Sequence, residues 1–231
     1  MSLQESVAEA FERCFGGTPV FVVRAPARVN LIGEHTDYND GFVLPIAIDR
    51  AIWIALRPRN DDEVAAYSLE FDETIRFALS SFENTGAGWA EYVKGVAWAL
   101  QDAGYGLSGW EGVVVGNVPR GAGLSSSAAL ELAAARSFAA VSDLTWDPKR
   151  MAKLCQRAEN HWVGMRCGIM DQMISAAGQA DRALLIDCRS LETEAVPLPA
   201  GTAVAVLDTA TRRGLVDSVY NERRAQCEAA A

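Results

Sequence analysis

The sequence has few histidines, no paired cysteines and no long apolar run. Only two of its 231 residues are His, and the five cysteines, Cys14, Cys155, Cys167, Cys188 and Cys227, are never spaced as a CxxC pair. Neither a zinc site nor a disulfide framework is therefore expected, and this cysteine usage is typical of a reducing compartment. No apolar run approaches the roughly 18 residues that a membrane helix needs. We therefore expect a cytoplasmic protein that has no membrane partner.

Basic residues are also in the minority. The chain has 21 Lys and Arg against 30 Asp and Glu, which gives a formal charge of −9. This balance favours solubility and argues against a nucleic-acid partner, although a local basic patch can still hold a phosphate. With 50% hydrophobic and 22% charged residues, the composition is that of a globular protein with a substantial core. We expect a monomer or a weak dimer.

Hydrophobic periodicity and turn residues divide the chain into helices and strands. Helices are predicted at residues 3–15, 89–100, 125–138, 147–163, 169–177 and from 216 onward. Strands are predicted at residues 20–24, 29–32, 43–48, 51–56, 63–67, 74–78, 110–118, 182–187 and 203–207. Because strands come early and helices late, the order favours an α+β layer fold.

A turn rich in glycine and serine separates the strand at 110–118 from the helix that follows. It consists of Gly121, Ala122, Gly123, Leu124, Ser125, Ser126 and Ser127. Glycines let a backbone approach a phosphate closely, and free N–H groups at a helix start attract negative charge. The turn lacks the lysine of a P-loop and the third glycine of a dinucleotide fingerprint. A plain glycine turn with serine N-caps explains the pattern about as well, but the run of three serines favours phosphate binding.

The stretch from Arg28 to Tyr38 is dense in polar side chains. It presents Glu34, His35 and Asp37 within four positions of a turn. Carboxylates accept hydrogen bonds from neighbouring hydroxyls, and imidazole can donate or accept, which suits the recognition of a polyol. The alternative is a solvated turn that is capped by its own side chains.

A single carboxylate, Asp171, stands between apolar neighbours at a predicted helix start. Burial raises the pKa of an aspartate, whereas a nearby arginine lowers it. A buried aspartate that acts as a base at neutral pH therefore needs a cationic partner. Chemistry alone favours the simpler interpretation, a helix N-cap.

Four separated motifs resemble the GHMP small-molecule kinases, and the galactokinase family in particular. Residues 119–128 are similar to the family's nucleotide loop. Residues 28–38 are similar to the galactokinase signature almost letter for letter, with Ala27 where the family usually has glycine. Residues 167–172 and 213–227 also match in family order, so the resemblance covers roughly residues 19–228. It implies the α+β fold of the GHMP kinase N-terminal domain, which is of the ribosomal protein S5 domain 2 type.

The resemblance also implies a reaction and its residues. The reaction is phosphorylation of the anomeric hydroxyl of galactose, with ATP as co-substrate and Mg²⁺ as cofactor. Asp171 is then the base with Arg28 as its partner, and Ser127 and Glu159 are the Mg²⁺ ligands. The implied sugar contacts are Glu34, His35, Thr36, Asp37, Gly168 and Tyr220, and residues 121–127 are the implied ATP contacts.

Family members carry a C-terminal domain with a further glycine-rich motif, which nothing after Tyr220 supplies. We therefore expect residues 1–231 to form the N-terminal domain, with weak or no turnover in this chain alone. Three alternatives stay open. The acceptor can be a related sugar, such as N-acetylgalactosamine, arabinose or a uronate. The protein can also be a non-catalytic sugar and ATP sensor, or an interaction module whose motifs are relics.

Overall fold

The computed structural model describes residues 2–86, 88–119, 121–207 and 216–230, with residues 216–220 described by their backbone only. Its helices are α1 (Leu3–Phe15), α2 (Ala90–Asp102), α3 (Ser126–Val141), α4 (Pro148–Arg157), the π-helix η1 (Ala158–Val163), α5 (Met170–Ala177) and α6 (Val216–Ala230). Its strands are β1 (Phe21–Asn30), β2 (Phe42–Val43), β3 (Pro45–Pro58), β4 (Glu63–Ser68), β5 (Glu73–Ala78), β6 (Trp110–Gly116), β7 (Arg182–Asp187) and β8 (Thr193–Pro197).

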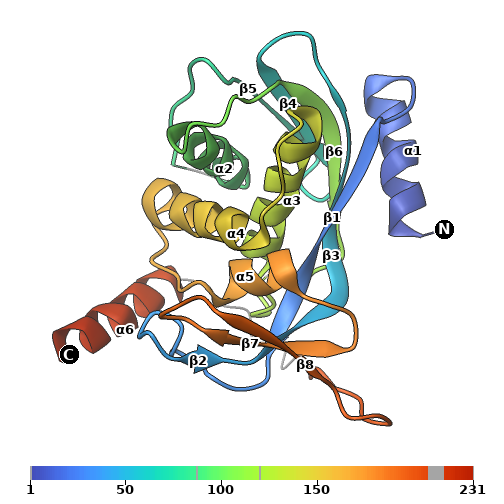
Figure 1. Cartoon of the computed structure of the whole chain (residues 1–231). Helices are drawn as coiled ribbons and strands as arrows, with labels where there is room; N and C mark the ends of the chain where they lie inside the picture. The colour runs from blue at the N-terminus through green and yellow to red at the C-terminus, as the bar shows by residue number, and fades with distance from the viewer. Residues whose placement is uncertain (1, 87, 120, 208–215, 231) are drawn as a thin grey trace.

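The strands form one mixed sheet with helices on both faces. The order is β2-β7-β3-β6-β4-β5, with β1 also paired to β3 and β8 to β7. Strands β4 and β6 run parallel, and the other pairs are antiparallel. Helix α1 covers one face, whereas α2, α3, α4 and α5 lie over the other (Figure 1). This arrangement confirms the predicted α+β layer fold.

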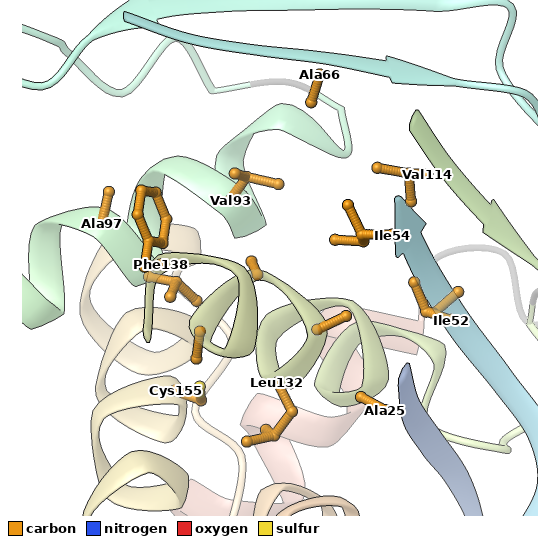
Figure 2. Packing of buried hydrophobic residues seen from close by; sticks show 14 of the residues in the cluster. Ala25, Ile52, Ile54, Ala66, Val93, Ala97, Val114, Leu132, Phe138 and Cys155 are labelled. Carbon is orange, nitrogen blue, oxygen red and sulfur yellow. The ribbon is translucent and has the colours of Figure 1, made fainter. Parts of the chain in front are cut away.

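The larger core lies between the sheet and helices α2, α3 and α4. Ile52 and Ile54 of β3 and Val114 of β6 lie toward the helices, where Leu132 and Phe138 of α3 belong to the same cluster (Figure 2). Several buried alanines on α3 have small side chains that allow the helix to approach β1 and β3 closely; they are Ala128, Ala129, Ala133, Ala134 and Ala135. This packing places the serine-rich start of α3 beside the end of β1.

Two pairs of predicted strands are each a single strand. The strands predicted at 20–24 and 29–32 are not separate. They are joined in β1, which runs through Pro26 with a register shift between Pro26 and Arg28. Such a bulge accommodates a residue that has no N–H to donate. The predictions for 43–48 and 51–56 are likewise joined in β3, where the exposed pair Asp49 and Arg50 interrupts only the apolar pattern.

Two further predictions are wrong, and one strand was not predicted. Residues 203–207 form no strand, and Val204, Val206 and Leu207 are exposed. The strand that was missed, β8, pairs with β7 and buries little of its own surface, so its apolar alternation is weak. The helix predicted over 147–163 divides at Arg157 into α4 and η1.

Among the described residues, no helix is both long and apolar enough to cross a membrane.

Candidate active site

Arg28 and Asp171 form a two-point ion pair across 143 positions of sequence. Nε of Arg28 lies 2.7 Å from Oδ1 of Asp171, and Nη2 lies 2.9 Å from Oδ2. Arg28 comes from the end of β1 and Asp171 from the first turn of α5. Asp171 is not the N-cap of α5, because Ile169 holds that position without a side-chain cap. Paired contacts of this kind are strong and fix both side chains in orientation.

The same arginine joins the acid to the glycine- and serine-rich turn. Its Nη1 donates to the carbonyl oxygen of Gly123 at 2.5 Å, and its backbone N–H donates to the carbonyl of Leu124 at 3.2 Å. The hydroxyl of Ser125 donates to the Asp171 carboxylate. Ser125, expected to contact ATP, therefore already binds the acid in this structure.

The start of α3 has an uncapped first turn. Ser125 is the N-cap residue, but it has a left-handed conformation (φ 60°) and makes no side-chain cap hydrogen bond. The alternative interpretation, serine N-caps, is therefore wrong for this helix. Gly121 and Gly123 flank Ala122 with φ of 66° and 74°, a region that glycine enters at little cost. The N–H groups at this helix end are suited to an anion.

The loop between β1 and β2 has a tightly determined backbone. Gly33 has φ 106°, and a Cβ there would lie 2.5 Å from the carbonyl oxygen of Phe42, so only glycine fits. The hydroxyl of Thr36 lies 2.8 Å from two carbonyl oxygens, those of Gly33 and Phe42. Thr36, expected to contact the sugar, thus stabilises the loop itself.

The remaining loop side chains are oriented by neighbours. Glu34 accepts a hydrogen bond from Nδ2 of Asn30 at 2.9 Å. Nδ1 of His35 lies 2.6 Å from the hydroxyl of Tyr38, and the backbone at His35 is left-handed (φ 61°). Loop residues in strained, well-fixed conformations are frequent at binding sites.

Asp37 lies against the chain segment that leads into α5. A Cβ on Gly168 would lie 1.9 Å from Oδ2 of Asp37, so this close approach requires glycine. Burial and the negative charge of Asp171 raise the pKa of Asp37 to about 6, against an ordinary 3.8, although Met170 donates a backbone hydrogen bond to it. The structure therefore brings Asp37, Gly168 and Asp171 together, as the sequence analysis expected.

The side chains of Ser127 and Glu159 contact each other near Asp171. Their side chains are hydrogen-bonded, and burial together with the charge of Asp171 raises the pKa of Glu159 to about 7. A hydroxyl and a carboxylate are the hard oxygen ligands that Mg²⁺ prefers, so the donor set fits that ion. No cluster of three or more His, Cys, Asp or Glu able to hold a metal occurs in the described part of the chain. A Mg²⁺ ion there would take its other ligands from phosphate and water.

A cavity of about 610 Å³ adjoins the start of α3, with Ser126 and Ser127 in its wall. Aromatic side chains also line it, among them Trp89 and Phe71, whose rings lie parallel with centroids 6.3 Å apart. No sequence motif indicated these aromatic residues. They come from separate loops and share no local motif. The one signal in the sequence that could have indicated them is the density of Trp and Phe around a glycine-containing loop.

Tyr220 is the one predicted site residue that this geometry leaves aside. Its backbone belongs to α6, but its side chain lies outside the described residues. Helix α6 itself contacts the segment before Gly168, since Arg224 donates to the carbonyls of Arg166 and Cys167.

Two family signatures match the chain. Residues 9–58 match the galactokinase galactose-binding signature, and residues 91–179 match the GHMP kinase N-terminal domain. The chain is 50% identical over 222 residues to a galactokinase of Roseiflexus sp. (strain RS-1); the match covers 96% of this chain and 57% of the relative. The chain thus spans little more than half the length of that relative.

Solved structures give the same result. The crystal structure of Lactococcus lactis galactokinase complexed with galactose matches with a TM-score of 0.88 and 34% identity, over 99% of this chain and 61% of that one. Methanococcus jannaschii mevalonate kinase shares the fold, with a TM-score of 0.64 and 16% identity, over 80% of this chain and 57% of that one. The chain therefore corresponds to the N-terminal part of the galactokinases, within the GHMP kinase family.

Proposed function

We propose that this protein phosphorylates the anomeric hydroxyl of galactose with ATP, giving galactose 1-phosphate. The observation that carries the proposal is the ion pair between Arg28 and Asp171. The same arginine contacts the glycine- and serine-rich turn, and the same aspartate lies near Asp37 of the polar loop. One pair of side chains therefore lies between a candidate phosphate site and a candidate sugar site.

The polar loop and its neighbours form the acceptor site in this proposal. Glu34, His35 and Asp37 supply hydrogen-bonding groups to the sugar hydroxyls, and Thr36 keeps the loop in shape. Gly168 leaves room beside Asp37, and Tyr220 follows from the family resemblance alone. A galactokinase of similar fold has been solved in complex with galactose, which supports galactose as the acceptor.

Asp171 acts on the acceptor hydroxyl. The guanidinium of Arg28 holds the carboxylate at two points, and the carboxylate orients the hydroxyl and takes its proton as the oxygen attacks the γ-phosphorus. The bond between the γ-phosphorus and the bridging oxygen breaks, and ADP leaves. Arg28 also places positive charge beside the reacting phosphoryl group, where positioning and electrostatics supply most of the rate enhancement.

The start of α3 and the adjoining cavity form the donor site. The N–H groups of residues 121–127 and the hydroxyl of Ser126 face the ATP phosphates in this proposal. Bound between Ser127 and Glu159, Mg²⁺ would neutralise phosphate charge. The cavity lined by Phe71 and Trp89 has the volume and aromatic walls that suit a nucleoside.

Calorimetric titration with galactose and with Mg-ATP tests binding first, because the chain spans 57% of the length of its relative. Phosphorus NMR then detects galactose 1-phosphate. We expect Asp171→Asn to retain galactose binding and to remove whatever product formation the wild-type chain shows, because the variant lacks the catalytic base. Absence of binding to both ligands contradicts the proposal, and a marked preference for N-acetylgalactosamine or arabinose contradicts the choice of galactose.

A further inference from the structure

Gln172 is a fully buried amide that lies between two buried carboxylates. Its Nε2 is 2.6 Å from Oε2 of Glu159 and 3.0 Å from Oε2 of Glu131. The exposed fraction of the residue is 0% for Gln172, 0% for Glu131 and 5% for Glu159. Both protons of the amide group are therefore used to bridge the two acids.

This arrangement is costly as a purely structural device. Oε1 of Gln172 and Oε1 of Glu131 are buried and have no hydrogen-bond partner among the residues that the structure describes. A buried polar atom without a partner costs about 1–3 kcal/mol, and an apolar side chain of similar volume avoids that cost. The amide therefore calls for an explanation beyond filling space.

The three side chains come from the three elements that carry the proposed machinery. Glu131 lies on α3, which begins with Ser126 and Ser127, and Glu159 lies on η1. Gln172 follows Asp171 on α5. The amide thus connects the helix of one candidate Mg²⁺ ligand to the side chain of the other.

The contacts also select one oxygen of Glu159. Gln172 donates to Oε2, and the thiol of Cys167 donates to the same atom at 3.2 Å. Neither donor engages Oε1, so tilting the carboxylate out of its present plane would lengthen both contacts at once. The carboxylate is held in a single orientation beside Ser127, with which it is hydrogen-bonded.

We propose that Gln172 is a positioning residue that orients the Glu159 carboxylate toward a Mg²⁺ ion shared with Ser127. This inference rests on the proposed function, because that function supplies the ion. Residues that orient a metal ligand from behind affect metal affinity by about 10–100-fold when they are replaced.

Two substitutions separate positioning from packing. Gln172→Met removes the amide at similar volume, and Gln172→Asn keeps an amide but withdraws it from both acids. Gln101→Met is the matched control, because the amide of Gln101 donates to the carbonyl of Leu79 at 2.9 Å, away from the proposed metal ligands.

Mn²⁺ replaces Mg²⁺ as the probe, and electron paramagnetic resonance measures its binding in the presence of a non-hydrolysable ATP analogue. We expect the Kd for Mn²⁺ to rise about 10–100-fold in both Gln172 variants. The Kd for galactose should stay within about twofold, since the amide does not contact the polar loop. Gln101→Met should leave both constants unchanged. A folded Gln172 variant with wild-type Mn²⁺ affinity overturns the inference.

A measurement on the wild-type protein decides the case even if both variants fail to fold. The side-chain amide NMR signals of Gln172 should shift when Mg²⁺ and the analogue are added, and they should not shift with the analogue alone. Signals that stay unchanged on Mg²⁺ addition overturn the inference. Wild-type protein that binds no Mn²⁺ overturns the proposed function as well, whereas Mn²⁺ binding that the Gln172 variants leave intact overturns the inference only.

Discussion

Two buried glutamates on neighbouring helices have opposite surroundings. Glu91 on α2 is 4% exposed and lies 3.0 Å from Nζ of Lys94. Burial by itself would raise the pKa of Glu91, but hydrogen bonds from Thr85, Lys94 and Trp162 bring it below the ordinary value. Glu131 on α3 is 0% exposed and, among the described residues, receives a hydrogen bond only from the amide of Gln172; burial and the charge of Glu159 raise its pKa well above the ordinary range.

The same contrast divides the acids of the candidate site. Asp171 has the guanidinium of Arg28, whereas Glu159 receives a hydroxyl, a thiol and an amide, all of them neutral donors. The charge of an acid with a cationic partner is balanced within the protein. The pKa of a buried acid without one is raised by burial, and strongly raised pKa values of this kind cluster at functional sites. The contrast therefore separates acids whose charge is balanced by an arginine or lysine from acids that have only neutral donors.

Removing Arg28 from its ion pair with Asp171 should produce the largest loss of stability. We expect Arg28→Leu to lower the free energy of unfolding by about 3 kcal/mol, because Asp171 is left as a partly buried charge without its partner. Galactose phosphorylation should be lost as well. Urea unfolding, followed by tryptophan fluorescence, measures the change in stability.

Arg24→Leu on the same strand is the control for that variant. Arg24 is exposed, donates to the carbonyls of Ile48 at 3.4 Å and Asp49 at 3.3 Å, and lies 5.7 Å from the centroid of the Trp53 ring. Its replacement should cost under about 1 kcal/mol. Equal stability of the two arginine variants would show that the Asp171 ion pair does not hold the fold together.

Removing the charge of a buried acid that has no ion-pair partner should raise the stability of the protein instead of lowering it. The pKa of Asp37 is 3.8 ordinarily and about 6 in the folded protein. Between these values the folded state binds more protons than the unfolded state, so stability falls as the pH rises through this window and stays low above it. Asp37→Asn should therefore stabilise the protein by about 2 kcal/mol at about pH 7.5 while it weakens galactose binding.

The pH dependence is the sharper readout of that variant. At about pH 4 the wild-type carboxyl is largely protonated, so the advantage of Asp37→Asn should nearly vanish. Asp40→Asn, in the same loop but exposed, should change stability by less than about 0.5 kcal/mol at either pH. A stability gain for Asp37→Asn that persists at about pH 4 would point to packing rather than charge.

Most of the fold was predictable because its helices and strands carry clear local patterns. Helix α1 ends at Gly16 as expected, and the valine-rich strand β6 was found directly from its composition. The unbroken strands β1 and β3 were not predictable, because pairing with neighbours carries a strand through Pro26 and through the polar pair at 49–50. The π-helical turn at Glu159 has no composition of its own that separates it from an α-helix.

The candidate site, like the fold, was predictable from the sequence only in part. Chemistry alone favoured an N-cap for Asp171, and only the family resemblance indicated a pairing with Arg28 across the chain. The cavity side chains Phe71 and Trp89 come from separate loops that tertiary packing brings together. The bridging amide of Gln172 was likewise invisible, since its two partners lie 41 and 13 positions away. Local motifs predicted which residues matter, and long-range contacts determine how they are connected.

One substitution made at both buried glutamates tests the contrast with the smallest expected effect. Burial and the charge of Glu159 raise the pKa of Glu131 and so favour its uncharged form. Glu131→Gln keeps the shape of the side chain and removes only the charge that burial disfavours, so it should change the free energy of unfolding by less than about 1 kcal/mol. Glu91→Gln, in contrast, leaves Lys94 buried without its counter-charge and should cost about 3 kcal/mol. Urea unfolding at neutral pH measures both, and equal losses at the two sites would mean that Glu131 is ionised and balanced by a cation.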